Sequence, residues 1–315
     1  MEHTDVTNYD GKRFFNPSGA HGKSFRSVPR LMVTPRARWP RRVPLTPVKP
    51  PRLAATSDVV VTFIGHSTFL IQSARGNILT DPQFSKRASP LQFIGPRRVR
   101  EPAVRFDDLP AIAVVLLSHN HYDHCDLTTL RRLAERFDPV VVTPLRNAPL
   151  VRSTGIREIE ELDWFQSASR TPFPVTLVPA QHFSARTPFD RNRALWGSFI
   201  FELSGHRIYF AGDTGYGPHF AQTRERVGAV DLALLPIGAY EPRWFMKDIH
   251  MNPDEAVRAH LHLGATQSIG MHFGTFQLTP EGIDAPVQAL EAAKRERRIP
   301  PEKFRVLGFG ESLLL

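Results

Sequence analysis

The feature that most constrains this fold is a set of four apolar, strand-like runs, each followed by residues that can bind a metal. The first run, AIAVVLL at 111–117, leads into SHNHYDHCD at 118–126, which holds three histidines and two aspartates. The runs PVTLVPAQ, RIYFAG and QSIGM are followed by His182, Asp213 and His272. If these strands end at one rim of a packed structure, the groups meet there. The sequence therefore predicts a metal site assembled from distant parts of the chain.

Within the nine-residue stretch, four side chains form the pattern H-x-H-x-D-H. On an extended or tightly turned backbone, His119 and His121 project to one side and can share an ion, while Asp123 and His124 can reach a second. Zinc accepts imidazole nitrogen and carboxylate oxygen, and a catalytic site needs about three protein ligands and a water. Four ligands are too few for two ions, so distant groups must complete the set. Asp213 is the natural bridge, because one carboxylate can hold two cations.

A helix cap or a charged turn would also place polar residues after a strand. Asp126 precedes LTTLRRLAERF, whose apolar residues recur at helical spacing, so we expect it to be a helix N-cap. A cap gives no reason for the three histidines, nor for His182, Asp213 and His272 at other strand ends. We therefore favour the metal site. We interpret Cys125 as a small buried residue beside it rather than as a nucleophile.

The positive charge of the chain is concentrated at its start. Residues 1–55 carry eleven Lys or Arg against three acidic residues, which accounts for most of the formal net charge of +9. They are rich in proline and show little periodicity, so we expect an N-terminal arm that wraps the rest of the chain. An anionic membrane, a nucleic acid or a protein could also bind such an arm. Because residues 56–315 are close to neutral, a nucleic acid is the less expected partner.

Residues 56–315 are predicted to form one α+β domain. Short β-rich runs are separated by Gly and Asp, and the run at 111–117 is apolar on both faces, which requires cover on both sides of its sheet. Helical spacing is confined to a few segments, among them 252–264 and 285–297. Strands that outnumber helices without strict alternation indicate two sheets packed face to face, with helices outside.

Membrane-spanning and secreted classes are not indicated. No apolar run approaches the roughly 20 residues of a membrane-spanning helix, and the start lacks the apolar stretch of a secretory signal. The single cysteine excludes an intrachain disulfide and fits a reducing compartment. We expect a cytoplasmic protein, with peripheral membrane contact as an alternative. The stretch SPLQFIGPRRVR at 89–100 mixes apolar and basic residues, and fits either a lipid interface or a packed loop with solvated arginines.

The motif HNHYDH, together with His182, GDTG at 212–215 and His272, resembles the metallo-β-lactamase superfamily. Longer stretches narrow the resemblance to the N-acyl-phosphatidylethanolamine-hydrolysing phospholipase D family. They lie within about residues 61–276 and read IGHSTFLI, LTDPQFSKRASPLQFIGPRR, LLSHNHYDH, LWGSF, YFAGDTGY, LPIGAYEPRWFM and MHFGTF. The resemblance implies a four-layer αββα sandwich with a two-metal site at one edge.

The same resemblance implies two zinc ions per chain, with iron or manganese as alternatives. It divides seven ligands between the ions: His119, His121 and His182 for one, Asp123, His124 and His272 for the other, and Asp213 as the bridge. His250, after EPRWFMKDI, matches a histidine thought to act near the substrate. Ile249 and the segment QHFSARTPFDRNRALWG depart from the family pattern, which leaves headgroup and acyl specificity open.

Several residues near this site have roles that the sequence leaves open. Tyr240, Glu241 and Trp244 are candidates for substrate binding, although GAYEPRWF also fits a packed loop. His66, in GHST, is either a partner of a ligand or an ordinary turn histidine. Asp81, in LTDP, lies at another strand end and is a candidate to hydrogen-bond a ligand histidine, since ligand histidines usually need such a partner.

These observations predict a phosphodiesterase of phospholipase D type acting on N-acyl-phosphatidylethanolamine or a related glycerophospholipid. Two cations roughly 3.5–4 Å apart would hold a bridging water, lower its pKa towards about 7, and direct the hydroxide at phosphorus. Asp123 would orient this nucleophile, and His250 or a metal-bound water would protonate the leaving alkoxide. The alternative is a lactonase or carboxylic-ester hydrolase on the same site, and a nuclease is a third hypothesis. Expected partners are a phospholipid or small phosphodiester, a membrane surface and a second copy of the chain.

Overall fold

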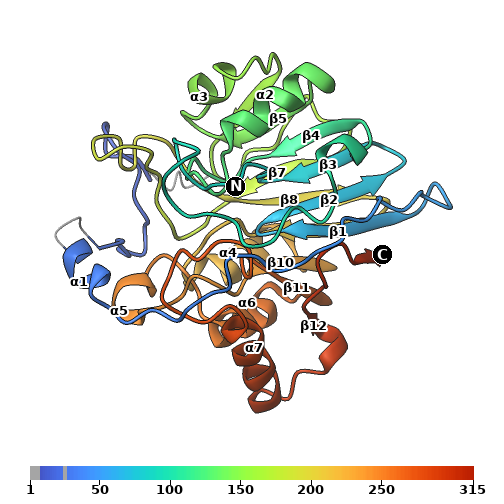
Figure 1. Cartoon of the computed structure of the whole chain (residues 1–315). Coiled ribbons are helices and arrows are strands. Elements are labelled where there is room, and N and C mark those ends of the chain that lie inside the picture. The colour runs from blue at the N-terminus through green and yellow to red at the C-terminus, as the bar shows by residue number, and fades with distance from the viewer. Residues whose placement is uncertain (1–7, 24–26) are drawn as a thin grey trace.

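Two β-sheets face each other in the computed structural model, which describes residues 8–23 and 27–315, and helices cover their outer faces (Figure 1). The first sheet has seven strands in the order β13-β1-β2-β3-β4-β5-β6, and the second has six in the order β12-β11-β10-β9-β8-β7. This arrangement confirms the predicted α+β class and the four-layer sandwich.

Both sheets are mixed. In the first sheet β13, β1, β2 and β3 pair antiparallel, whereas β3 to β6 run parallel. In the second sheet β7 to β9 pair antiparallel, and β9 to β12 run parallel. The strands of the first sheet are β1 (Val59–Gly65), β2 (Thr68–Ser73), β3 (Asn77–Thr80), β4 (Ile112–Leu116), β5 (Val140–Pro144), β6 (Ile159–Leu162) and β13 (Ser312–Leu314). Those of the second are β7 (Val175–Val178), β8 (Ser198–Leu203), β9 (His206–Phe210), β10 (Leu232–Pro236), β11 (Gln267–Met271) and β12 (Phe304–Arg305).

The helices are short, and all but α1, which precedes β1, lie between strands in the described chain. Helix α2 lies over the first sheet, whereas α6 and α7 lie on the side of the second sheet (Figure 1). The α-helices are α1 (Val28–Met32), α2 (Leu127–Arg136), α3 (Ala148–Arg152), α4 (His219–Val227), α5 (Arg243–Met246), α6 (Pro253–Leu263) and α7 (Ala285–Glu296). Short 3₁₀ turns occupy Phe106–Asp108 and Pro301–Lys303. None of the helices within the described residues combines the length and apolar character that a bilayer crossing requires.

The first sheet is buried on both faces, which explains its apolar strands. Phe63 and Phe69 point into the core between the sheets, where they join Trp196. Leu70 and Leu79, on the opposite face, pack in a second core beneath α2. Alternate residues of one strand therefore enter two different cores, so a continuous apolar run is required. This packing fixes the strand ends, and with them the loops that carry the predicted site.

The described part of the predicted N-terminal arm lies against the domain. Trp39 Nε1 donates to the carbonyl of Glu281 at 2.8 Å, and the amide of Val48 donates to the carbonyl of Ala103 at 2.7 Å. Nearer the start, the Asn16 side chain both donates to the carbonyl of His182 and accepts from its amide, at 2.9 and 3.2 Å. The arm thus reaches the residues around the predicted site. A domain boundary at residue 56 stays a prediction.

Asp126 caps α2, as expected, and it does more than a cap requires. Its carboxylate accepts from the amides of Thr128 and Thr129 at 3.1 and 3.3 Å. It also accepts from the amides of Phe84 and Ser85, at 3.2 and 2.9 Å, and so ties the chain after β3 to the start of the helix. This buried carboxylate therefore joins two loops that border the predicted site.

We expect Asp126→Ala to destabilise the fold by about 2 kcal/mol or more, because a lost cap alone costs about 1 kcal/mol and the buried amides of the loop also lose their acceptor. Urea unfolding followed by circular dichroism measures this. Asp284→Ala is the matched control, since Asp284 precedes α7 but makes no side-chain cap bond. Equal stability of the two variants would contradict the role assigned to Asp126.

Candidate metal centre

Side chains from five loops meet at one edge of the sandwich. The stretch 118–126 follows β4, and the loops after β7, β9 and β11 carry His182, Asp213 and His272. His66 joins them from the turn between β1 and β2. The structure therefore brings together all seven residues that the sequence predicted as ligands, in two neighbouring groups.

The first group holds three imidazoles and one carboxylate. His121 Nδ1 lies 2.8 Å from His119 Nε2 and 3.2 Å from His182 Nε2, so three ring nitrogens face one another. Asp213 Oδ2 lies 3.9 Å from His119 Nε2 and 3.8 Å from His182 Nε2. Ligand atoms of all four residues lie within 4.8 Å of one another, which suits a single metal ion.

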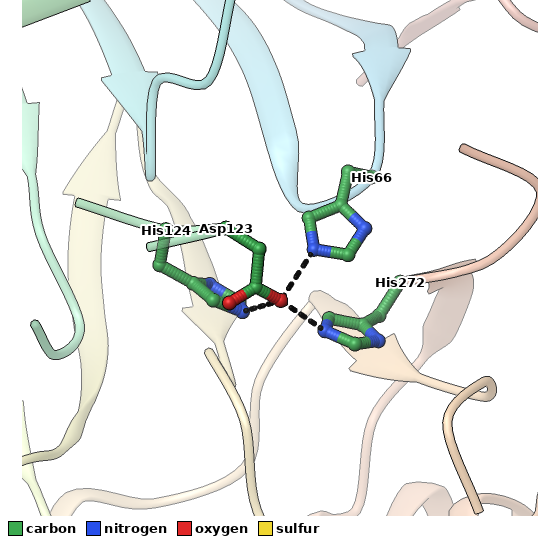
Figure 2. Close-up of side chains that lie close together, drawn as sticks. All are labelled: His66, Asp123, His124 and His272. Atoms are coloured by element: carbon green, nitrogen blue, oxygen red, sulfur yellow. Dashed lines mark hydrogen bonds and ion pairs between the residues drawn. The ribbon is translucent and has the colours of Figure 1, made fainter. Parts of the chain in front are cut away.

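The second group surrounds Asp123. Its Oδ2 lies 3.0 Å from His66 Nε2 and 3.4 Å from both His124 Nε2 and His272 Nε2. Figure 2 shows the three rings converging on this carboxylate from separate segments of the chain. Ligand atoms of these four residues also lie within 4.8 Å of one another.

Asp213 lies between the two groups. Its Oδ2 is 3.1 Å from His124 Nε2, and its Oδ1 is 3.2 Å from His272 Nε2. The same Oδ2 is the atom that approaches His119 and His182 in the first group. One carboxylate therefore faces imidazoles of both groups, which is the position that a bridging ligand needs.

Three of the histidines are oriented through their other ring nitrogen. His182 Nδ1 must donate to the carbonyl of Ile249, at 2.8 Å, and His124 Nδ1 lies 2.6 Å from Asp81 Oδ2. The hydroxyl of Ser118 donates to Asp81 Oδ2 at 2.6 Å, so its lone pair is left to accept from His119 Nδ1 at 2.9 Å. With these partners on the other ring nitrogen, each of the three rings presents Nε2 to the centre, which is the atom that binds a metal once it carries no proton. The hydrogen bond that the sequence suggested between Asp81 and a predicted ligand histidine is therefore confirmed, and the histidine is His124.

Several buried atoms in the centre lack a hydrogen bond that would compensate their burial. Within residues 8–23 and 27–315, His124 Nε2, His272 Nε2 and Asp213 Oδ1 have no aligned hydrogen-bond partner, although each imidazole nitrogen lies at ion-pair distance from one oxygen of Asp213. Leaving a buried polar atom unpaired costs free energy, so such atoms call for a missing partner. Converging lone pairs around two carboxylates fit a cation. The His and Asp clusters therefore suit a dinuclear metal site.

The charges within the centre support this fit. Burial alone would raise the pKa of Asp213, but His124 and His272 outweigh it and hold this pKa well below its usual range. Burial alone would lower the pKa of His272, but Asp213 and Asp123 raise it to about 9. For His121, burial outweighs the attraction of Asp123 and Asp213 and lowers the pKa to about 3. One side of the metal-free centre thus holds neutral imidazoles, and the other holds protons that a bound cation would replace.

The backbone is held in uncommon conformations around the centre. His66, Asp81 and His272 have φ values of 57°, 32° and 62°, in or near the left-handed region. Gly212, before Asp213, has φ 58°, and a Cβ there would lie 2.5 Å from Ser118 Cβ. Such backbone costs free energy and tends to cluster at functional sites. Here it brings the loops close enough for their side chains to meet.

Comparison with known proteins gives the family. The beta-lactamase superfamily domain matches residues 76–273, which is more than half of the chain. The chain belongs to the metallo-β-lactamase superfamily. Its His and Asp clusters fit a metal centre, in keeping with this membership.

The superfamily includes relatives of known and unknown activity. An uncharacterized protein of Mycobacterium tuberculosis is 43% identical over 248 residues, which cover 77% of this chain and 66% of the relative. N-acyl-phosphatidylethanolamine-hydrolyzing phospholipase D 1 of Caenorhabditis elegans is 37% identical over 233 residues, 70% of this chain and 65% of the relative. The mitochondrial enzyme of the same name from Saccharomyces cerevisiae is 35% identical, over 68% of this chain and 47% of the relative. The chain thus spans slightly less than two thirds of the first two relatives, and about half of the third.

Solved structures share the metallo-β-lactamase fold. An isothiocyanate hydrolase from Delia radicum gut bacteria aligns with a TM-score of 0.65 at 21% identity, over 81% of this chain and 98% of that one. A metallo hydrolase of Ignicoccus hospitalis aligns with a TM-score of 0.61 at 22% identity, over 82% and 98%. At these identities the likeness establishes the fold and no particular substrate.

His250 lies beside the candidate metal centre. Its Nε2 is 3.7 Å from Asp213 Oδ2, and its ring centroid is 5.1 Å from that of His182. Arg243, in α5, holds this segment by donating to the carbonyl of His250 at 2.9 Å and to Glu255 at 2.7 Å. The position of His250 is thus fixed by a buried network.

The three residues predicted to bind substrate lie in and before α5. Glu241 accepts from the amide of Arg243 at 2.9 Å, and the guanidinium of Arg30 lies 4.4 Å from the centroid of a Trp244 ring. Tyr240 is largely buried, and its amide donates to Glu281 at 3.2 Å. Arg243 donates to the carbonyls of both Tyr240 and His250, at 3.2 and 2.9 Å, and so links these two segments. The substrate role of the three residues stays a prediction.

A cavity of about 760 Å³ lies next to the centre and is not lined by the predicted ligands. Gln181, which precedes His182, lines this cavity, and its side chain accepts from the hydroxyl of Ser18 at 2.8 Å and donates to the carbonyl of Asp248 at 3.1 Å. Aromatic side chains of Trp164 and Phe165 form part of the wall.

Two contacts in the centre had no decisive signal in the sequence. His66 was left open, yet it is buried and touches Asp123 at 3.0 Å. Its place directly after the buried strand β1 is the same signal that pointed to the predicted ligands. The carbonyl of Ile249, which orients His182, had no signal at all because every residue has a carbonyl.

We expect Asp81→Asn to weaken zinc binding by about 10- to 100-fold. The carboxylate accepts from the Ser118 amide at Oδ1 and from the Ser118 hydroxyl and His124 Nδ1 at Oδ2, whereas an amide offers an acceptor at only one of these positions. Competition with a chromogenic chelator measures the affinity. Asp58→Asn is the control, since Asp58 accepts from the amides of Ala54 and Ala55 outside the centre. A folded Asp81→Asn protein with unchanged affinity would show that this orientation is unnecessary.

Zinc uptake at pH 7 should release protons, because the pKa of His272 is about 9 and that of His124 lies well above its usual value in the metal-free centre. Calorimetric titration in two buffers of different ionisation enthalpy counts these protons. Affinity should rise as the pH approaches about 9. Metal uptake without proton release would refute this charge assignment.

In the metal-free protein, the raised pKa of His272 stabilises the fold below pH 6.5, and this contribution is lost as the pH rises through about 9.

Proposed function

We propose that this chain is a dinuclear-metal phosphodiesterase of phospholipase D type, acting on N-acyl-phosphatidylethanolamine or a related glycerophospholipid. The observation that carries the proposal is the Asp213 carboxylate between two groups of converging imidazoles. The phosphodiester substrate is supported by the relatives at 37% and 35% identity whose names state that activity. The activity of the whole protein is part of the proposal, because the chain spans only part of those relatives.

The proposed ligand set follows the two groups of the centre. One ion is held by His119, His121 and His182, the other by Asp123, His124 and His272, and Asp213 is shared. We propose zinc, with iron or manganese as alternatives that accept the same nitrogen and oxygen donors. Two such ions supply an activated water and neutralise charge on the phosphoryl oxygens.

Asp123 is proposed to orient the attacking water. His66 Nε2 lies 3.0 Å from Asp123 Oδ2 and restricts the rotation of this carboxylate. The ring of His66 is itself fixed, because its centroid lies 4.1 Å from that of His272 and 5.2 Å from that of Phe276. An immobilised carboxylate oxygen can accept a hydrogen bond from the water and direct its lone pair at the substrate.

His250 is proposed to contact the leaving oxygen of the substrate. Burial holds its pKa well below the usual range, so in the free protein the ring is neutral with one N–H to donate. Its Nδ1 is buried without a hydrogen-bond partner among the described residues, and is free to meet a substrate or to take up a proton. The negative charge of a bound phosphodiester would raise this pKa, and the ring could then protonate the leaving alkoxide.

The remaining parts of the proposal concern partners. Tyr240, Glu241 and Trp244 would line the approach to His250 and contact the lipid headgroup. A cytoplasmic location with peripheral membrane contact would give access to such a substrate, and a homodimer is a further proposed assembly. A lactonase or carboxylic-ester hydrolase is the alternative, because a two-metal centre can direct water at a carbonyl carbon as well as at phosphorus.

Substrate preference separates these activities. The purified protein is analysed for metal and offered N-acyl-phosphatidylethanolamine, a bis-aryl phosphodiester and an acyl-homoserine lactone. We expect two metal ions per chain and turnover of the phosphodiesters. Lactone turnover without phosphodiester turnover would favour the alternative. Less than one bound metal ion per chain, under metal-replete conditions, would contradict the dinuclear centre.

Asp213→Ala is expected to abolish activity, because it removes the ligand shared by both ions. His250→Ala should lower kcat by about 10²- to 10⁴-fold and leave the metal content unchanged, as expected for a proton donor. His206→Ala, at the first residue of β9, is the control with full activity. Metal analysis beside each rate distinguishes the roles. Loss of metal from His250→Ala would make His250 a ligand instead.

A further inference from the structure

A loop beside the metal centre exposes three large apolar side chains at its tip. The loop, residues 85–97, leaves Leu91, Phe93 and Ile94 exposed by 47%, 76% and 60%. Bulky apolar side chains that gather at one exposed place usually mark an interaction surface. The sequence left two interpretations for this stretch, a lipid interface or a packed loop. The exposure of the tip contradicts the packed loop.

The loop is internally held in shape. The side chain of Arg87 lies within it and donates to the carbonyls of Gln92 and Gly95, at 3.1 and 2.5 Å. The amide of Ala88 donates to the carbonyl of Pro96 at 3.0 Å across the loop. The apolar tip is thus presented by an ordered backbone, so less conformational entropy is lost when a partner covers it.

The base of the loop is tied to the metal centre. The amide of Ser85 donates to Asp126 at 2.9 Å, in the stretch that carries four proposed ligands. Arg98 donates to both the carbonyl and the side chain of Gln83, each at 2.6 Å. Gln83 lies two residues after Asp81, which orients His124. A partner bound at the tip is therefore held in a fixed relation to the centre.

The charge around the tip selects the kind of partner. Lys86 and Arg97 are exposed on the two sides of the loop, and the segment from 84 to 98 contains no acidic residue. Apolar side chains combined with flanking basic ones suit an anionic phospholipid surface, where the apolar groups enter the acyl boundary and the basic groups meet the phosphates. The formal net charge of +9 favours the same partner at longer range.

We propose that the loop 85–97 docks on anionic phospholipid bilayers by inserting Leu91, Phe93 and Ile94, while Lys86 and Arg97 pair with lipid phosphates. This inference rests on the proposed function, since docking brings the centre to a substrate that resides in the bilayer. It deepens that function by assigning the surface through which the substrate is reached. The partner is a membrane surface, not a single lipid bound in solution.

The test is co-sedimentation with vesicles that contain no proposed substrate. Vesicles of phosphatidylcholine alone are compared with vesicles that also contain phosphatidylglycerol. The wild-type protein should prefer the anionic vesicles, and Leu91→Ser, Phe93→Ser and Ile94→Ser together should weaken binding about tenfold or more. Lys86→Gln with Arg97→Gln should weaken binding to anionic vesicles and reduce its salt dependence. Leu261→Ser, at an α6 leucine exposed by 46%, is the matched control and should bind as wild type.

Hydrolysis of a soluble bis-aryl phosphodiester is measured on the same proteins. Unchanged soluble turnover with weakened vesicle binding in the triple variant supports the docking role. Wild-type protein that ignores anionic vesicles, or a triple variant that binds them fully, overturns it while leaving the proposed phosphodiesterase intact. A triple variant that changes a dimer into a monomer on size exclusion, with vesicle binding unchanged, would assign the tip to contacts between copies instead. If none of the proteins hydrolyses the soluble phosphodiester, the result counts against the proposed phosphodiesterase activity and not against membrane docking.

Discussion

The structure depends on the burial of two carboxylates among converging imidazoles at one edge of a β-sandwich. Asp123 and Asp213 are almost enclosed, and burying an ionised carboxylate is costly unless a cation compensates it. In the metal-free protein, protons on His124 and His272 supply part of that compensation. Divalent cations would supply it more completely. The buried charges of the centre therefore lower the stability of the fold locally, and metal binding would offset this free energy.

The sandwich makes this arrangement possible. Because the first sheet is buried on both faces, its strands cannot slide without moving apolar residues out of two cores. The strand ends are thus fixed, and so are the loops that carry the centre. Asp126 and Asp81 then connect neighbouring loops through hydrogen bonds, one at the start of α2 and the other at His124. The burial of the first sheet on both faces therefore keeps the sandwich rigid and also fixes the positions of the proposed ligands.

The sequence predicted the layers and the meeting of the seven proposed ligands because both depend on local patterns. Apolar runs indicate buried strands, and a polar residue directly after each run indicates a shared rim. It left His66 open because its contact with Asp123 depends on how the turn after β1 faces a loop 57 residues away. It could not foresee the carbonyl of Ile249 as the partner of His182, since backbone acceptors leave no pattern. Substrate residues are harder still, because their roles depend on a molecule outside the chain.

The central claim is that Asp213 bridges two metal ions. The most direct measurement is anomalous diffraction at the zinc absorption edge from crystals of the metal-loaded protein. The account predicts two peaks roughly 3.5–4 Å apart. One should lie among His119, His121 and His182, the other beside Asp123, His124 and His272, with the Asp213 carboxylate between them. A single peak on one side of Asp213, or two ions that Asp213 does not touch, would contradict it.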